Sequence, residues 1–414
     1  MPRSKKSTTA AASTVDTISS LPDAILCRIL SFFTTKEAVA TSILSKRWIH
    51  LWHHVPNLNF PYINVDTVNS GLLFNEFVYS VLLSREIAGS NLINSFTLHI
   101  QYDNPHLAFD LGFPNITKWI NVAVQRKLKH LCLGLDVDNL DDNGDDYDAD
   151  YPNLPVSIFT CTTLVSLDLR WFRVDGFSFS SNGFQFPSLK TLNLKSVNFS
   201  KVRDFMLFIA GCPILEELRI EMDFPLDEED SLTLQEFKRL SLPKLIRADL
   251  IQFRCQCFPL NALSTAKYLY INTLKVNQLQ RPYHVIPIFH NLTDLVLHHD
   301  RWDLIVQVLH QCPKLQNLEL QKGLCDSFWC EVGDQENWVE PEFVPQCLLS
   351  SLRTFTIHDL SDLPSDLMLE QYILKNATIL QTMTIWCKTE QPEMERTLSM
   401  CPVASATCEL SLCC

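Results

Sequence analysis

One pattern of apolar positions recurs along most of the chain: an apolar residue, two variable residues, an apolar residue, one variable residue and a further apolar residue. From residue 93 onward it occurs eleven times, mostly 21 to 30 residues apart, with three longer gaps. The last two apolar positions alternate with polar ones, which predicts short strands with one buried face. The occurrences are INSFTL (93–98), LKHLCL (128–133), LVSLDL (164–169), LKTLNL (189–194), LEELRI (215–220), LIRADL (245–250), AKYLYI (266–271), LTDLVL (292–297), LQNLEL (315–320), LRTFTI (352–357) and LQTMTI (380–385).

Helical stretches separate several of these strands, among them KVRDFMLFIAGCP (201–213) and RWDLIVQVLHQCP (301–313). A strand that recurs in this way resembles the leucine-rich repeat, whose strands form a parallel stack with the helices on the convex side. An ordinary α/β fold could supply two or three such matches by chance, but hardly eleven. The asparagine expected after the strand is mostly missing, and LKTLNLKSVNF has Val197 and Phe199 there instead. We therefore expect an irregular α/β solenoid.

In such a stack, the residues between the buried positions form the concave wall. The wall would mix acids, bases and aromatic rings, which suits recognition of a protein surface rather than of phosphate. For any single residue, a merely solvated position remains an equal alternative. The candidate target-binding residues are Asp168, Arg170, Asn193, Lys195, Glu217, Arg219, Tyr268, Tyr270, Asp294, His298 and Glu319, with Glu221 and Gln321 beside them.

Residues 21–60 follow a different, helical pattern. Pro22 suits a first helical turn, and Ile25, Leu26, Ile29, Leu30 and Phe33 form one wide apolar stripe. Thr34 and Glu37 have the spacing of a capping box for a second helix. Ser45 could cap a third helix that carries Trp48, Leu51 and Trp52. Three short helices cannot bury so much apolar surface against one another, so a partner is expected.

The stretch LPDAILCRILSFFTTKEAVATSILSKRWIHLWHHVPNLNF resembles an F-box of the plant type along its whole length, although Ala40 stands where a longer polar residue is common. The resemblance implies docking onto the Skp adaptor of a cullin-based ubiquitin ligase. The tryptophans would be anchors for packing and partner binding, and Lys46 and Arg47 suit an acidic partner surface. The residues that the resemblance places in or beside the adaptor interface are Leu21, Pro22, Ile25, Leu26, Ile29, Leu30, Val39, Leu44, Ser45, Lys46, Trp48 and Trp52.

The two ends of the repeat region carry further signals. VDTVNSGLLFNEFVYSVLLSRE (65–86) predicts a helix that fixes the geometry between the F-box and the repeats. WVEPEFVPQCLLSSLRTFTIHDL (338–360) and the segment after it resemble the FBD domain of plant F-box proteins, although Pro402 and Val403 depart from its closing strand. The expected domains are a tail at 1–16, the F-box at 17–62, a linker helix at 63–92, leucine-rich repeats at 93–337 and an FBD cap at 338–414.

Charge and cysteine content exclude several classes of protein. The net charge of -13 argues against a general nucleic-acid binder, although residues 21–60 are locally basic. No apolar run approaches the roughly 20 residues of a membrane-spanning helix. The N-terminus has no apolar run that would make it a signal peptide, so the 15 cysteines are expected to be reduced thiols, many of them in the core, in a cytoplasmic or nuclear protein.

Candidate chemistry is sparse. The aspartate-rich loop 136–150 approaches the spacing of a calcium loop around Gly144, but the first aspartate and the terminal glutamate are missing, which favours a solvated loop. His50, His53 and His54 lack a neighbouring Cys or carboxylate to complete a metal site. There is no phosphate loop and no G-x-S-x-G or C-x-x-C motif, so neither catalysis nor a cofactor is expected.

These observations and resemblances together lead us to expect the substrate-recognition subunit of an SCF-type ubiquitin ligase. The F-box would dock on the Skp-type adaptor, and through it on a cullin, while the repeats hold a target protein. The alternative is an interaction scaffold that binds the adaptor or another partner through the F-box without promoting ubiquitination.

Overall fold

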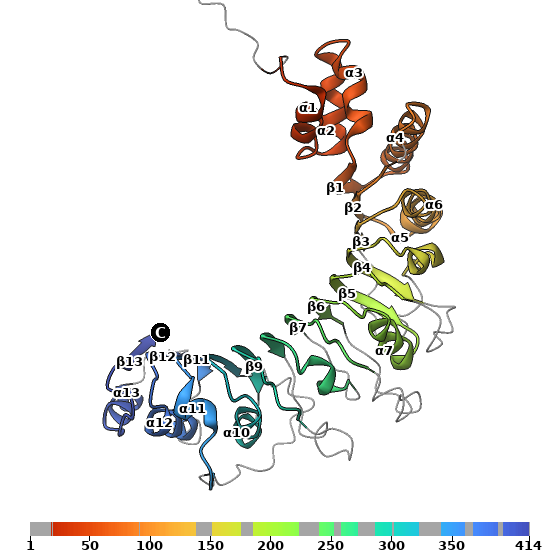
Figure 1. Cartoon of the computed structure of the whole chain (residues 1–414). Helices are drawn as coiled ribbons and strands as arrows, with labels where there is room; N and C mark the ends of the chain where they lie inside the picture. The colour runs from red at the N-terminus through yellow and green to blue at the C-terminus, as the bar shows by residue number, and fades with distance from the viewer. Residues whose placement is uncertain are drawn as a thin grey trace, which may run out of the picture.

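The computed structural model describes residues 18, 20–90, 92–137, 151–174, 185–222, 240–251, 258–271, 286–299, 302–322, 341–360, 367–387 and 392–413. Their strands form one parallel sheet in which β1 to β13 follow one another in chain order. Figure 1 shows an arc with the strands along its inner side and the helices along its outer side. The strands are β1 Asn57–Val65, β2 Ser95–Tyr102, β3 His130–Val137, β4 Ser166–Val174, β5 Thr191–Phe199, β6 Glu217–Glu221, β7 Arg247–Ile251, β8 Tyr268–Ile271, β9 Asp294–His299, β10 Asn317–Lys322, β11 Thr354–Leu360, β12 Thr382–Cys387 and β13 Glu409–Cys413.

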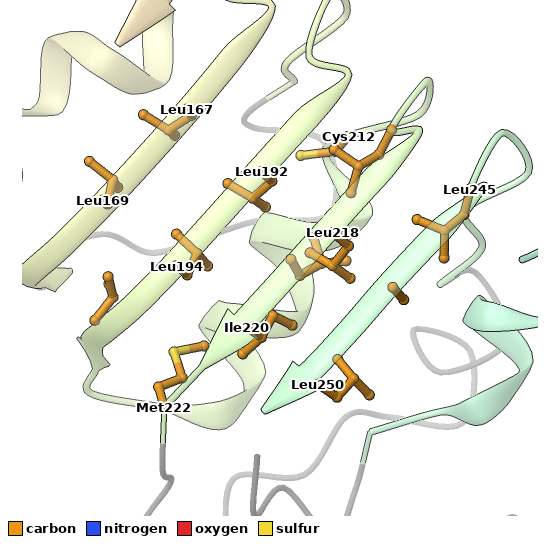
Figure 2. Close-up of a cluster of buried hydrophobic side chains, with 14 of the residues drawn as sticks. Leu167, Leu169, Leu192, Leu194, Cys212, Leu218, Ile220, Met222, Leu245 and Leu250 are labelled. Atoms are coloured by element: carbon orange, nitrogen blue, oxygen red, sulfur yellow. The ribbon is translucent and has the colours of Figure 1, made fainter. Parts of the chain in front are cut away.

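The recurring apolar positions build the core, which confirms the α/β solenoid. Leu167 and Leu169 of β4 pair in register with Leu192 and Leu194 of β5, and all four are at most 1% exposed. The same two levels continue into β6 and β7, as Figure 2 shows. Each repeat therefore covers the apolar side of the previous one, as expected for stacked repeats.

Two strands contain a left-handed residue that the sequence pattern did not reveal. Trp171 in β4 and Ser196 in β5 have φ values of 65° and 48°, in the left-handed region. The pairing of β4 with β5 passes from Arg170–Lys195 directly to Phe172–Val197. Because both strands have one extra residue at the same level, their register is kept, but the alternation of inward and outward side chains reverses in each. This explains why Val197, placed three residues after Leu194 rather than two, is buried.

The segments between strands are helical to different degrees. The two predicted convex helices are confirmed as α7 Val202–Ala210 and α10 Trp302–His310. Between β3 and β4, and again between β7 and β8, the described connection contains only a 3₁₀ turn, so a full helix after every strand is not the rule. The other outer elements are α5 Pro105–Leu107, η3 Ala108–Gly112, α6 Phe113–Val124, η4 Val156–Thr160, η6 Leu260–Leu263, α11 Gln346–Ser350, α12 Leu367–Asn376 and α13 Pro392–Ser399.

The N-terminal module consists of short helices: α1 Asp23–Leu30, α2 Thr35–Ala40, η1 Thr41–Ile43, α3 Trp48–Leu51 and η2 Trp52–His54. The predicted capping box of Thr34 and Glu37 is confirmed. The predicted Ser45 cap is wrong: the residue before α3 is Arg47, and no side chain caps this helix. Pro22 lies one position earlier than predicted, as the N-cap of α1.

The module is joined to the sheet without a free linker. The predicted helix after it is confirmed as α4 Val68–Ile87, but β1 precedes this helix and was not predicted as a strand. Thr35 of α2 accepts a hydrogen bond from the Asn59 backbone N–H of β1 over 2.7 Å. The short helices therefore cover the outer edge of β1, which would otherwise present unpaired backbone groups.

Candidate functional site

The N-terminal module exposes an apolar face. Ile43 is 89% exposed and Phe32 is 75% exposed, values that are unusual for large apolar side chains in such a small module. Ile25, Ile29, Phe33, Leu44 and Ile49 are also exposed. We call this set the docking face: Ile25, Ile29, Phe32, Phe33, Ile43, Leu44 and Ile49.

The predicted interface residues divide into two groups. Pro22, Ile25, Ile29, Leu44, Ser45 and Lys46 are exposed, while Leu21 and Val39 are half-buried. Leu26, Leu30, Trp48 and Trp52 are buried in the chain's own core, so they can support the docking face from below but do not present their side chains to a partner. Phe32, Phe33, Ile43 and Ile49 were missed as site residues, because only the fold reveals which side of each helix is uncovered.

The basic residues of the module also differ from each other. Arg47 donates from Nε to Asp23 Oδ1 over 2.7 Å and also bonds to the Leu21 carbonyl oxygen. This guanidinium therefore holds the start of α1; its side chain is 36% exposed, and its contact with an acidic partner stays a prediction. Lys46 is exposed beside the docking face, so its side chain can contact an acidic partner surface.

The histidines and thiols of the described residues form no metal site. His50 and His53 stack on each other with centroids 5.9 Å apart, and no group of three possible ligands is found among the residues described. The cysteines placed by the structure are free thiols, and burial raises the pKa of Cys347 to about 12, which keeps that thiol protonated. The possible calcium loop of residues 136–150 lies almost entirely outside the described residues.

The concave wall carries the predicted polar residues in rows along the sheet. From β4 to β7 most of its charges neutralise one another: Asp168 with Arg170, Lys195 with Glu221, and Arg247 with Asp249. Asn193 Nδ2 also donates to Asp168 over 2.9 Å. Hydrogen bonding to their aspartates raises the pKa of both arginines, so both remain charged.

A hollow of about 220 Å³ lies over the same strands, lined by residues of β4 to β7. Glu217 and Arg219 lie in it and form no ion pair with the residues described. They are therefore the charges of this part of the wall that remain available to a partner.

From β8 to β12 the wall is richer in rings. Tyr270 Oη and His298 Nε2 are 2.8 Å apart, and Glu319 Oε1 lies 3.1 Å from His358 Nε2. Asp294 accepts a hydrogen bond from Asn317. His358 stacks on Trp386, with an interplanar angle of 8°. Sequence reasoning found Tyr270, Asp294, His298 and Glu319 but missed His358 and Trp386, which follow the last apolar position of their repeats.

This geometry defines an adaptor-type repeat protein with one apolar docking face at the end of an arc and a polar concave wall along it. No helix among the residues described is long and apolar enough to cross a membrane. Comparison with known families agrees with the three regions. The F-box domain model matches residues 18–60, the model of LRR repeats of FBD-associated F-box protein At5g56370 matches residues 116–228, and the FBD model matches residues 340–385.

Relatives extend over nearly the whole chain. F-box/FBD/LRR-repeat protein At4g26340 of Arabidopsis thaliana is 30% identical over 96% of this chain and 99% of its own length. F-box/FBD/LRR-repeat protein At4g00160 of the same plant is 32% identical over 89% of this chain and 86% of its own. The chain belongs to the F-box/FBD/LRR-repeat family of plant proteins. Its domain composition is that of a substrate adaptor.

Proposed function

We propose that this protein is the substrate-recognition subunit of an SCF-type ubiquitin ligase. The docking face binds the Skp-type adaptor and thereby a cullin, while the concave wall binds a target protein for ubiquitination. The single observation that carries the first half is the high exposure of Ile43 and Phe32 within the region matched by the F-box model.

The proposed mechanism needs no bond chemistry in this chain. Binding a target beside a ubiquitin-charged enzyme raises the effective concentration of the target's lysines. The covered edge of β1 supports this role, because a docking module packed directly on the sheet limits the freedom of the bound target. The protein would act in the cytoplasm, the nucleus or both.

The test is capture of the adaptor and cullin from plant extract by the full chain and by an Ile43→Asp variant. Because Ile43 is 89% exposed, the substitution should leave the fold intact while placing a charge inside the interface. We expect capture to fall by at least about tenfold. Leu73→Asp is the matched control, since Leu73 is 58% exposed on α4 outside the docking face.

The results separate the ligase from the scaffold. Loss of both proteins with Ile43→Asp but not with Leu73→Asp supports the proposal. Capture of the adaptor without any cullin favours a scaffold that does not promote ubiquitination. If wild type captures neither, the ligase function is rejected.

A further inference from the structure

The two halves of the concave wall differ in charge. The wall from β4 to β7 presents Arg170, Lys195, Arg219 and Arg247. On β8 to β12, the described side chains that face the concave side include no lysine or arginine. They are Tyr268, Tyr270, Asp294, Val296, His298, Asn317, Glu319, Gln321, Thr354, Thr356, His358, Thr382, Thr384 and Trp386. Among the side chains that the structure describes, this half therefore combines rings with carboxylates and has no permanent cation.

The boundary between the halves shows what such a surface binds. The Arg247 guanidinium lies over the Tyr268 ring, 3.7 Å from its centroid. It also makes two hydrogen bonds to Asp249, of 2.9 and 3.0 Å. A cation over a ring with a carboxylate beside it gains both a cation–π attraction and a charge-assisted pair. Here the protein supplies all three groups itself.

The next ring along the wall, Tyr270, has no cation beside it in its row on the two adjacent strands; the nearest one in that row on the N-terminal side is Arg219, two strands away on β6. Tyr270 pairs in register with Val296, which pairs with Glu319, so the three residues form one row across β8, β9 and β10. Adjacent strands are about 4.8 Å apart, which separates the Tyr270 and Glu319 backbones by roughly 10 Å. Val296 between them is 8% exposed, so neighbouring side chains cover most of it, and an extended side chain of a partner would lie on top of this row.

Both ends of this row are held in place. Tyr270 is fixed through its hydroxyl by His298 at 2.8 Å. Glu319 Oε1 accepts from Gln321 Nε2 over 3.0 Å and lies against His358. Glu319 Oε2 makes no hydrogen bond with the described residues, so it can accept from a partner. The Glu319 carboxylate is therefore held in one orientation, and its Oε2 can still accept a hydrogen bond from a partner.

Among the described residues Glu319 has no lysine or arginine partner, and its contact with His358 is an ion pair only when that imidazole is protonated. Burial lowers the pKa of His298, against the opposing effect of Glu319, so this imidazole is neutral near pH 7. Asp294, one strand away, adds a second negative charge. A cationic side chain is therefore favoured here over an anionic or a neutral one.

We propose that the row Tyr270, Val296 and Glu319 binds an arginine or lysine side chain of the target protein, with the cation between the tyrosine ring and the glutamate. The inference rests on the proposed function, because it names the chemistry of the segment that the concave wall would hold. The same acidic character disfavours RNA as the occupant of this half.

The test uses the full-length chain and fluorescein-labelled Gly/Ser peptides that carry either three arginines or three citrullines, the neutral analogue of arginine. Fluorescence anisotropy at near-physiological ionic strength gives the affinity. We expect the arginine peptide to bind at least about tenfold more tightly than the citrulline peptide. Glu319→Gln and Tyr270→Leu should each weaken binding of the arginine peptide by about fivefold to tenfold.

The control is Glu409→Gln on β13, which removes the same charge from an exposed position on the same sheet. It should change the affinity by less than about twofold. The proposal is overturned if the two peptides bind equally, or if Glu319→Gln and Glu409→Gln weaken binding of the arginine peptide equally. The second result would mean that the peptide is held by non-specific electrostatic attraction to an acidic protein. Adaptor capture is measured on the same preparations. If the chain captures the adaptor but binds both peptides equally, only this site is rejected. If it prefers the arginine peptide but does not capture the adaptor, only the ligase function is rejected.

Discussion

At the residue scale, Arg85 determines how the docking module meets the repeats. Its side chain is fully buried, donates to the Leu92 carbonyl over 2.9 Å and also bonds to the Val55 carbonyl. One guanidinium thus satisfies carbonyls from the end of the helical module and from the segment that leads into β2. Burial, together with the charge of Arg126, lowers the pKa of Arg85 to about 10, so it remains charged at neutral pH.

Replacing Arg85 with Met should therefore destabilise the protein. The apolar stem would be kept, but buried carbonyl oxygens would lose their donor, which costs about 2 kcal/mol in the free energy of unfolding. Urea denaturation followed by circular dichroism measures this loss. Lys190→Met is the control, because its exposed pair with Glu216 should contribute no more than about 0.5 kcal/mol. Equal losses in the two variants would contradict the role given to Arg85.

Sequence alone located the site residues only in part at this scale. Glu319 and Tyr270 follow from strand alternation, since each lies between two buried positions of its repeat. Arg85 was not singled out, because a buried arginine in a helix looks the same in the sequence as a solvated one. Ile25 and Leu26 belong to one apolar stripe, yet one is 48% exposed and the other is buried. When one apolar stripe packs partly against the core and partly against a partner, the sequence does not show which of its residues are buried and which are exposed.

At the scale of single elements, β4 and β5 continue past the repeat motif through the left-handed residues Trp171 and Ser196. They let Phe172 and Val197 point inward after the pleat has reversed. The strand β1 has a similar irregularity at Tyr62, whose φ is 51°, next to Pro61. A proline and a break in alternation both argue against a strand, which is why β1 was not predicted from the sequence.

Ser196→Gly should stabilise the protein by about 0.5 kcal/mol. Relief of the left-handed conformation is worth roughly 1–2 kcal/mol, and the greater freedom of glycine in the unfolded chain offsets part of it. Ser166→Gly, at a β4 position without positive φ, should instead lose about 0.5–1 kcal/mol. Thermal denaturation of both variants measures the difference. If both substitutions destabilise equally, the left-handed conformation of Ser196 carries no strain.

At the scale of the whole molecule, the two edges of the sheet differ. The helical module covers β1, and β13 pairs with β12 at the other end of the arc (Figure 1). The repeats and the general architecture were predictable, because eleven copies of one motif leave few alternatives. The direct packing of the module on the sheet was not predictable, because it depends on contacts between segments of unlike pattern.

Deletion of residues 409–414 should expose the edge of β12. Five residues of β12, from Thr382 to Trp386, would lose the neighbouring strand, and an uncovered parallel edge promotes association. Size-exclusion chromatography with light scattering should show a higher average mass than for the full chain as concentration rises. A chain without residues 1–16, predicted as a tail, is the control. An unchanged mass in the deletion variant would show that β13 does not protect the sheet.

Because the sheet is continuous, it also fixes the distance between the docking module and the row at Tyr270. β8 is the seventh strand after β1, so the row at Tyr270 lies roughly 34 Å along the sheet from the strand that carries the docking module. A relative with one more strand between them would hold the same kind of peptide about 4.8 Å further away and at a different angle. In a ligase, the number of repeats would then select which lysines of a target come within reach of the ubiquitin-charged enzyme.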